Sequence, residues 1–172
     1  MKDVNTGTAG NLAVIFYVLI MWSLLVSLNS VHAANHNYNY IAFWNVNEAG
    51  IFNLNFIYPS LLAFPVAGRY SIVLTSYFSN TPDNFKGIGT IFTEGTNLTA
   101  IVVASFFAFA IIYILLGLAG VFSLLITVLG TLSAAFYFEK RFGGVNGDML
   151  GFGVKVSEVV FMAALCGFHR II

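Results

Sequence analysis

Residues 98–138 read LTAIVVASFFAFAIIYILLGLAGVFSLLITVLGTLSAAFYF and contain no charged side chain. A helix crosses the hydrocarbon core of a bilayer in about 20 apolar residues, so this stretch is about twice as long as one crossing requires. Gly117 and Gly120 lie at its middle, and glycines at such a position are typical of a tight turn. The stretch therefore predicts two membrane-spanning helices joined at these glycines, and it predicts a polytopic membrane protein.

The composition of the whole chain supports the same class. Its 172 residues are 59% hydrophobic and 8% charged, against roughly 25% charged in a typical soluble domain. Charges are missing from residues 4–47 and 95–138, which are 44 residues each. Seven basic and seven acidic side chains balance, so no strong electrostatic field favours nucleic acid as a partner. The single cysteine, Cys166, excludes an intrachain disulfide.

Three further apolar segments bring the expected number of spans to five, give or take one. They run from about residue 11 to 31, from 51 to 78 and from 149 to 168. Pro59 and Pro65 lie within the second segment, and proline removes a backbone donor, so we expect that helix to be bent or broken. The predicted fold class is all-α, with one membrane-embedded domain formed by the whole chain.

The positions of lysine and arginine predict the orientation. A cytoplasmic N-terminus places most basic residues in cytoplasmic loops or helix ends, and this agrees with the positive-inside rule. These residues are Lys2, Lys86, Lys140, Arg141 and Lys155. The predicted outer loops contain no basic residue, and only Arg170 falls at the outer end of the chain. We therefore expect a multi-pass protein of the plasma membrane with a cytoplasmic N-terminus, and a polar cytoplasmic loop over residues 80–97.

The richest polar segment beside a span is residues 143–158, GGVNGDMLGFGVKVSE. Five glycines surround Asp148, and Lys155 and Glu158 follow at a spacing that places them on one face of a helix. Glycines let backbone approach a ligand closely or let neighbouring helices touch. Asp148 is thus a candidate site residue. The alternative interpretation, which composition alone favours, is that Asp148 only caps the last helix and the glycines only pack.

Three other polar features lie near the spans. Lys2 and Asp3 precede a glycine-containing turn into the first span, although a plain positive anchor explains them equally well. Lys86 lies beside Gly87 and Gly89 and could form an anion-binding nest or a re-entrant loop. Arg69, within the second span, could contact a phosphate or pair with a buried carboxylate.

Read in order, three segments resemble the adenosylcobinamide-GDP ribazoletransferase (cobalamin synthase) family. MKDVNTGTAGNLAVIF resembles its M-K/R-D-S-R-x-G-T-x-G segment and the apolar helix that follows. FPVAGRYSIVLTSYF and then FKGIGTIF resemble its arginine-bearing helix and G-L-G-x-x-F loop. FGGVNGDMLGFGVKVSEVVFMAAL resembles its closing G-G-x-T-G-D-x-L-G-A-x-x-E-x-x-E-x-x-x-x-L segment, which is the most specific of the three.

The chain also departs from the family pattern. The family's upstream acidic motif, H-x-D-G-x-x-D-x-x-D-G, has no counterpart, so the resemblance covers only the carboxyl-terminal two-thirds of the family. Asn5 stands where the first motif has arginine, and Lys155 stands where the last motif has its first glutamate, whereas Glu158 matches the second. We therefore expect a truncated, split or degenerate member that needs the missing acidic segment for activity.

The resemblance implies a membrane-embedded transferase of late cobalamin (vitamin B12) biosynthesis that uses Mg²⁺. It would join adenosylcobinamide-GDP to α-ribazole or its 5′-phosphate and release GMP, and a separate chain carrying the acidic motif is a further expected partner. Carried over residue by residue, the resemblance gives catalytic and metal-binding roles to Asp148 and Glu158. Asp3 is a further expected metal ligand, and the expected phosphate contacts are Lys2, Arg69 and Lys86.

A non-catalytic membrane subunit or a small-molecule transporter is the alternative function. A helix that contains Pro59, Pro65 and Arg69 is also typical of a broken, substrate-conducting transporter helix. The absence of an internal sequence repeat counts against a transporter, because many transporter folds are built from such repeats.

Overall fold

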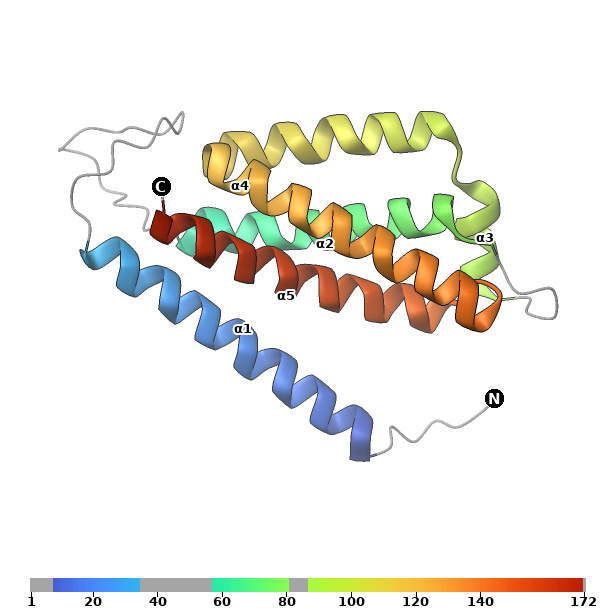
Figure 1. The fold of residues 1–172 in the computed structure, drawn as a ribbon, viewed down its shortest axis with the longest axis horizontal. Coiled ribbons are helices and arrows are strands. Elements are labelled where there is room, and N and C mark those ends of the chain that lie inside the picture. The colour runs from blue at the N-terminus through green and yellow to red at the C-terminus, as the bar shows by residue number, and fades with distance from the viewer. Residues whose placement is uncertain (1–7, 35–56, 81–86, 172) are drawn as a thin grey trace.

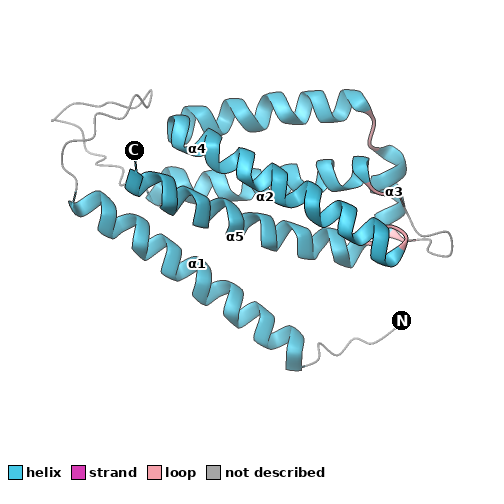
Figure 2. Cartoon of the chain, viewed as in Figure 1, coloured by secondary structure: helices cyan, strands magenta, loops and turns pink. Residues whose placement is uncertain are grey.

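The computed structural model describes residues 8–34, 57–80 and 87–171, which form helices and short connections without any strand (Figures 1 and 2). The helices are α1 (Thr8–Ala34), α2 (Ile57–Phe78), α3 (Ile88–Gly95), α4 (Leu98–Phe142) and α5 (Gly147–Ile171). Within these ranges, four helices are long and apolar enough to cross a membrane: α1, α2, α4 and α5. The all-α, polytopic prediction is confirmed.

Helix α4 is a hairpin of two helices rather than one rod. Gly117 interrupts it with φ 62° and ψ −148°, which is a backbone region that essentially only glycine adopts. Figure 1 shows the first half running away from α3, reversing, and returning alongside α5. The predicted pair of helices is therefore confirmed and the turn lies at Gly117. Counting the two halves of α4 separately, the described ranges hold five helices of a length and composition that suit a membrane crossing.

The bundle has two ends of different character. The end that we call the α3 end holds the starts of α1 and α5, the end of α2, the whole of α3 and the connection from α4 to α5 (Figure 1). The opposite end holds the Gly117 turn and the last residues of α5. Helices α1 and α5 run parallel, since Tyr17 contacts Glu158 and Leu24 contacts Cys166, at nearly equal sequence separations of 141 and 142 residues.

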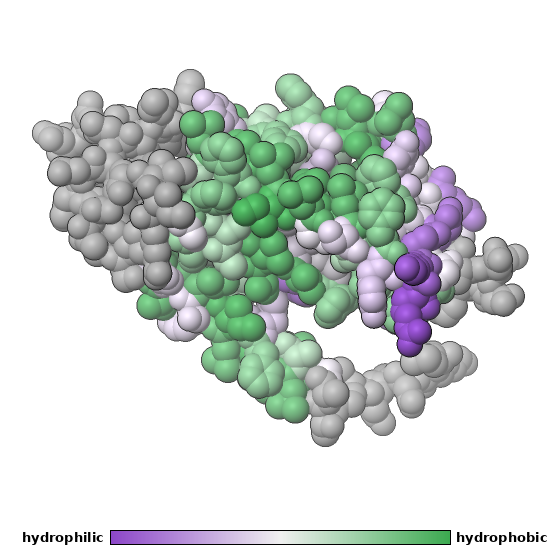
Figure 3. Space-filling view, in the orientation of Figure 1, coloured by the Kyte–Doolittle hydropathy of each residue, from purple (hydrophilic) through white to green (hydrophobic). Residues whose placement is uncertain are grey.

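Polar and apolar surfaces are separated along the bundle. In Figure 3 hydrophobic residues cover its length, whereas hydrophilic residues gather at the α3 end, over α3 and the end of α4. Exposed large hydrophobics are numerous on α1 and on both halves of α4; Phe106 is 69% exposed and Trp22 is 68% exposed. Such a surface would be an aggregation hazard in water, and it suits contact with lipid chains.

The core lies where α2, α4 and α5 meet, and it combines small apolar residues with hydroxyl groups. Ala63 and Ala67 on α2 are fully buried, and small residues let membrane helices approach closely. Hydroxyls also bond between helices: Tyr70 Oη lies 2.7 Å from Ser105 Oγ, and Thr131 Oγ1 lies 3.1 Å from Ser157 Oγ. Satisfied hydroxyls of this kind stabilise helix association in a bilayer.

Of the expected bend or break in α2, the break is wrong, and the expectation of a polar loop throughout residues 80–97 is wrong as well. Helix α2 continues through Pro65 and is not broken there, because packed neighbours make such a residue tolerable in a membrane helix. The region expected to be a polar loop, residues 80–97, contains the short helix α3. The part of the expected second span that precedes residue 57 lies outside the described residues.

We predict that Gly117→Ala destabilises the protein by about 1–3 kcal/mol, because a Cβ is strained at this φ and ψ. The control is Gly130→Ala within the second half of α4, where an added Cβ meets only Val160 Cγ1 at 4.0 Å. That change should stabilise the helix by up to about 1 kcal/mol through propensity alone. Thermal unfolding in detergent measures both variants, and equal melting temperatures would show that Gly117 does not need its glycine conformation.

Candidate functional site

Three segments far apart in the sequence meet near the α3 end, and glycines make the contacts possible. A Cβ on Gly89 of α3 would lie 2.8 Å from the backbone nitrogen of Gly147, so α3 touches the start of α5 backbone to backbone. A Cβ on Gly68 of α2 would lie 2.7 Å from Cγ of Glu158. The segments that resemble the second and third family motifs are therefore in direct contact.

Glu158 is a buried carboxylate with two partners. It is 4% exposed, and its Oε2 accepts from the Tyr17 hydroxyl at 2.5 Å and from Lys155 Nζ at 2.9 Å. The same ammonium lies 4.8 Å from the centre of the Tyr17 ring, within range of a cation–π contact. Removing one partner from a buried charge costs several kcal/mol, so this cluster stabilises the attachment of α1 to α5.

The cluster does not fit a metal ion at Glu158. The Lys155 ammonium lies where a cation would have to approach the carboxylate, and Mg²⁺ binds through oxygen ligands rather than beside an ammonium. Among the described residues, no group of three or more histidine, cysteine, aspartate or glutamate side chains could hold a metal ion. The structure therefore shows Oε2 of Glu158 bound by Lys155 and Tyr17.

Asp148 lies in the first turn of α5 and is exposed. It does not cap the helix, because Asn146 Oδ1 accepts from the backbone nitrogen of Met149 at 2.9 Å. The capping interpretation of Asp148 is therefore wrong, and Asn146 is the capping residue. Asp148 and Glu158 are ten residues apart on one helix, which at 1.5 Å per residue is about 15 Å. One ion cannot bind both carboxylates.

Asn80, just after the end of α2, binds the end of α4 and the connection that leads into α5. The backbone nitrogen and the side-chain amide of Asn80 donate to the Glu139 carboxylate at 2.9 and 2.7 Å. The carbonyl of Asn80 accepts from Val145 at 2.8 Å. Between Glu139 and Val145 the chain turns at Gly143, which has φ 71°, and Gly144, which has φ 142°. Both values favour glycine. This turn fixes the position of the first residues of α5.

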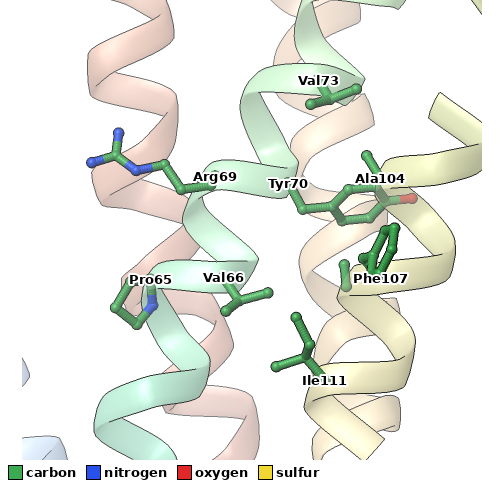
Figure 4. Close-up of a pocket in the computed structure, with 9 residues that line it drawn as sticks. Pro65, Val66, Arg69, Tyr70, Val73, Ala104, Phe107 and Ile111 are labelled. Carbon is green, nitrogen blue, oxygen red and sulfur yellow. The ribbon is translucent and has the colours of Figure 1, made fainter. Parts of the chain in front are cut away.

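A cavity of about 330 Å³ lies between α2, α3 and α5, and we call it the Arg69 pocket. Its lining consists of Arg69, Ile72, Phe92, Gly147, Leu150, Gly151, Val154 and Lys155. A second cavity of about 350 Å³ lies on the α4 side of α2 and is lined by apolar residues besides Arg69. In Figure 4 the Arg69 side chain lies on the opposite side of α2 from Tyr70, Phe107 and Ile111, toward the side on which α5 lies.

The structure places some of the predicted site residues and leaves others outside its description. Asp148 lies at the α3 end, in the first turn of α5. Arg69 follows Gly68, which packs on Glu158, so Arg69 and Glu158 lie at a similar depth in the bundle. Lys2, Asp3 and Lys86 lie outside the described residues. Lys155 and Tyr17 were not predicted as site residues. The spacing of Lys155 and Glu158 on one helical face already indicates their contact. The signal for Tyr17 is weaker: it lies at helical spacing from Met21, Leu24 and Leu28, which form one packed face of α1.

Comparison with known proteins gives one family. A family model described as cobalamin-5-phosphate synthase (CobS) matches residues 1–166. The adenosylcobinamide-GDP ribazoletransferase of Clostridium novyi (strain NT) is 27% identical over 168 residues, which is 98% of this chain and 58% of that protein. The protein of the same name from Klebsiella pneumoniae (strain 342) is 28% identical over 169 residues, 96% of this chain and 58% of the relative.

A third relative of the same name, from Geotalea daltonii, is 30% identical over 108 residues, 63% of this chain and 43% of that protein. The chain thus spans less than two thirds of the length of these relatives. No solved structure matches the chain.

Proposed function

Because the chain belongs to the cobalamin-5-phosphate synthase (CobS) family, we propose that it acts in late cobalamin biosynthesis as an adenosylcobinamide-GDP ribazoletransferase. The reaction joins adenosylcobinamide-GDP to α-ribazole or its 5′-phosphate and releases GMP. The observation that supports this most directly is the meeting of the motif segments in space. Gly68 packs on Glu158, Gly89 packs on Gly147, and the Arg69 pocket lies between the same helices.

The chemistry of this transfer requires stabilisation of phosphate charge. A ribose hydroxyl of the incoming nucleoside forms a new bond to the phosphorus that is attached to cobinamide. The bond from this phosphorus to the GMP oxygen breaks, and the hydroxyl proton is released. A guanidinium binds phosphate oxygens through a planar fork of donors, and such preorganised charge favours the transition state. We propose Lys2 and Lys86 as contacts of the reacting diphosphate and Asp148 as the catalytic carboxylate. We assign Arg69 to a phosphate group that holds a substrate in place.

The proposal that magnesium and a partner chain take part in the reaction rests on the family resemblance. When bound, a divalent ion neutralises the charge of the diphosphate. Asp148 and Asp3 are the ligands that we favour, because Lys155 and Tyr17 already bind Oε2 of Glu158, the third proposed ligand. We further propose a separate chain that carries the acidic motif as the source of the other carboxylates, since carboxylate oxygens are the ligands that magnesium prefers.

A reconstituted transfer assay tests the function. The chain is expressed in membranes alone and together with the part of the Clostridium novyi relative that it does not match, and both are supplied with adenosylcobinamide-GDP, α-ribazole 5′-phosphate and Mg²⁺. We expect the combination to release GMP and form cobalamin 5′-phosphate, the chain alone to form none, and EDTA to abolish the reaction. The relative's part alone is the control. No product from the combination, with the intact relative active in parallel, would contradict the proposal.

We also propose that the α3 end faces the cytoplasm of a cell whose plasma membrane holds the protein. Lys140 and Arg141 end α4 there, and Lys155 lies in the nearer half of α5, whereas Arg170 lies in the last turn of α5 at the opposite end. This asymmetry agrees with the positive-inside rule.

Cysteine labelling in intact cells measures this orientation. In a Cys166→Ser background, we expect Phe142→Cys, at the exposed end of α4, to react with an impermeant maleimide only after the cells are opened. Asn37→Cys, between α1 and α2 in the sequence, should react in intact cells. The reverse pattern would place the α3 end outside.

Asp148→Asn separates a catalytic role from a structural one. Since Asn146 is the capping residue, this change should alter stability by only a few tenths of a kcal/mol. If Asp148 acts in the reaction, turnover in the reconstituted assay should fall at least ~100-fold, or about 2.7 kcal/mol. The control is Asn146→Ala, which should cost about 1 kcal/mol of stability through the lost cap. Wild-type turnover in Asp148→Asn would remove Asp148 from the site.

A further inference from the structure

The Arg69 pocket combines one uncompensated cation with apolar walls. In the part of the chain that the structure describes, Lys155–Glu158 is the one salt bridge, so Arg69, which is exposed, takes part in no ion pair there. Because Lys155 is balanced by Glu158, the net positive charge beside the pocket comes from Arg69. A charge on a membrane helix is costly without a partner, so an anionic group is the partner that this pocket lacks.

The start of α5 adds to the preference for an anion. Gly147, the first residue of this helix, lines the pocket, and the amino-terminal end of a helix has a partial positive charge. Asp148 lies in the same turn and offsets part of that charge, but it is not among the lining residues. Arg69 therefore remains the dominant charge that a ligand meets.

The remaining walls fit a flat apolar group. Ile72, Leu150 and Val154 line the pocket together with the ring of Phe92, which is 46% exposed. An exposed aromatic ring offers a stacking surface for another planar ring. The volume of about 330 Å³ is at the small end of the usual range for ligand pockets. It suits a single nucleotide and is far too small for a corrinoid that carries GDP.

We infer that the Arg69 pocket binds the smaller substrate, α-ribazole 5′-phosphate, with its phosphate at Arg69 and its aromatic base against Phe92. This inference rests on the proposed function, since it assigns one of the two substrates of that reaction to one cavity. The corrinoid substrate then lies outside the pocket, and the ribose of the bound nucleotide faces it.

Two glycines of α5 offer a matched test of the pocket. Gly151 lines the pocket, and a Cβ added there meets nothing within 4 Å. Gly153, two residues further along the same helix, has equally open space around an added Cβ but does not line the pocket. A leucine at Gly151 therefore fills the cavity, whereas a leucine at Gly153 adds the same side chain elsewhere on the helix.

The experiment measures equilibrium binding of α-ribazole 5′-phosphate and of unphosphorylated α-ribazole to the chain in phosphatidylcholine nanodiscs. We expect Gly151→Leu to weaken both ligands about tenfold or more and Gly153→Leu to change neither by more than roughly twofold. Arg69→Gln should weaken the phosphate ester about tenfold or more, which is in the range of a charge-assisted contact. It should leave α-ribazole within roughly threefold, because the base does not contact the guanidinium.

The outcomes separate this inference from the proposed reaction. Three results would overturn the pocket assignment even if the transfer assay succeeds. They are undiminished binding of both ligands by Gly151→Leu, equal losses of affinity for the two ligands in Arg69→Gln, and no binding of either ligand by the unmutated chain. The same binding is also measured in a detergent without phosphate groups. Binding that occurs only in that detergent would assign Arg69 to lipid phosphate and would also overturn the pocket assignment. The expected binding pattern together with a failed transfer assay would instead overturn the transferase function and leave the nucleotide site standing.

Discussion

The buried carboxylate of Glu158 is the constraint on which the rest of the bundle depends. A carboxylate that is 4% exposed inside a membrane-spanning bundle needs partners, and each partner comes with a structural consequence. Lys155 balances its charge, Tyr17 attaches α1 through a hydrogen bond, and Gly68 lets α2 approach closely enough to pack on it. Packing of α1, α2 and α5 is thus arranged around one acidic group.

Most of the fold could be predicted from the sequence because the bilayer imposes simple rules. Charge-free length predicted two crossings within residues 98–138, and the glycine near their middle is the residue with the positive φ. Helix α3 was missed, because its eight residues carry no such signal. Its position depends on the backbone contact of Gly89 with Gly147, which exists only in the folded protein. The expected break in α2 failed for a related reason, since packing against α4 and α5 supports the helix through Pro65.

The candidate site was predictable in part. Charge in a membrane helix singled out Arg69, and glycines around a carboxylate singled out the first residues of α5. Other site residues lacked a distinguishing mark: Tyr17 is one of eight tyrosines and Phe92 is one of 18 phenylalanines. Only their neighbours in space give them a role. The identity of the helix cap was also invisible, because Asn146 and Asp148 are equally good capping residues by type.

The spacing of Lys155 and Glu158 has a consequence for how the protein enters the membrane. The two residues are three apart on one helix and form their ion pair within it, so the pair needs no other helix to close. Helix α5 can therefore partition into the bilayer with these two charges already neutralised rather than as a segment bearing two separate charges. Helix α1 precedes α5 in the chain, so its Tyr17 hydroxyl meets Glu158 only after α5 has been synthesised. Two helices whose contacting residues lie 141 or 142 positions apart in the sequence then join side by side, and this pairing has to wait for the later of the two.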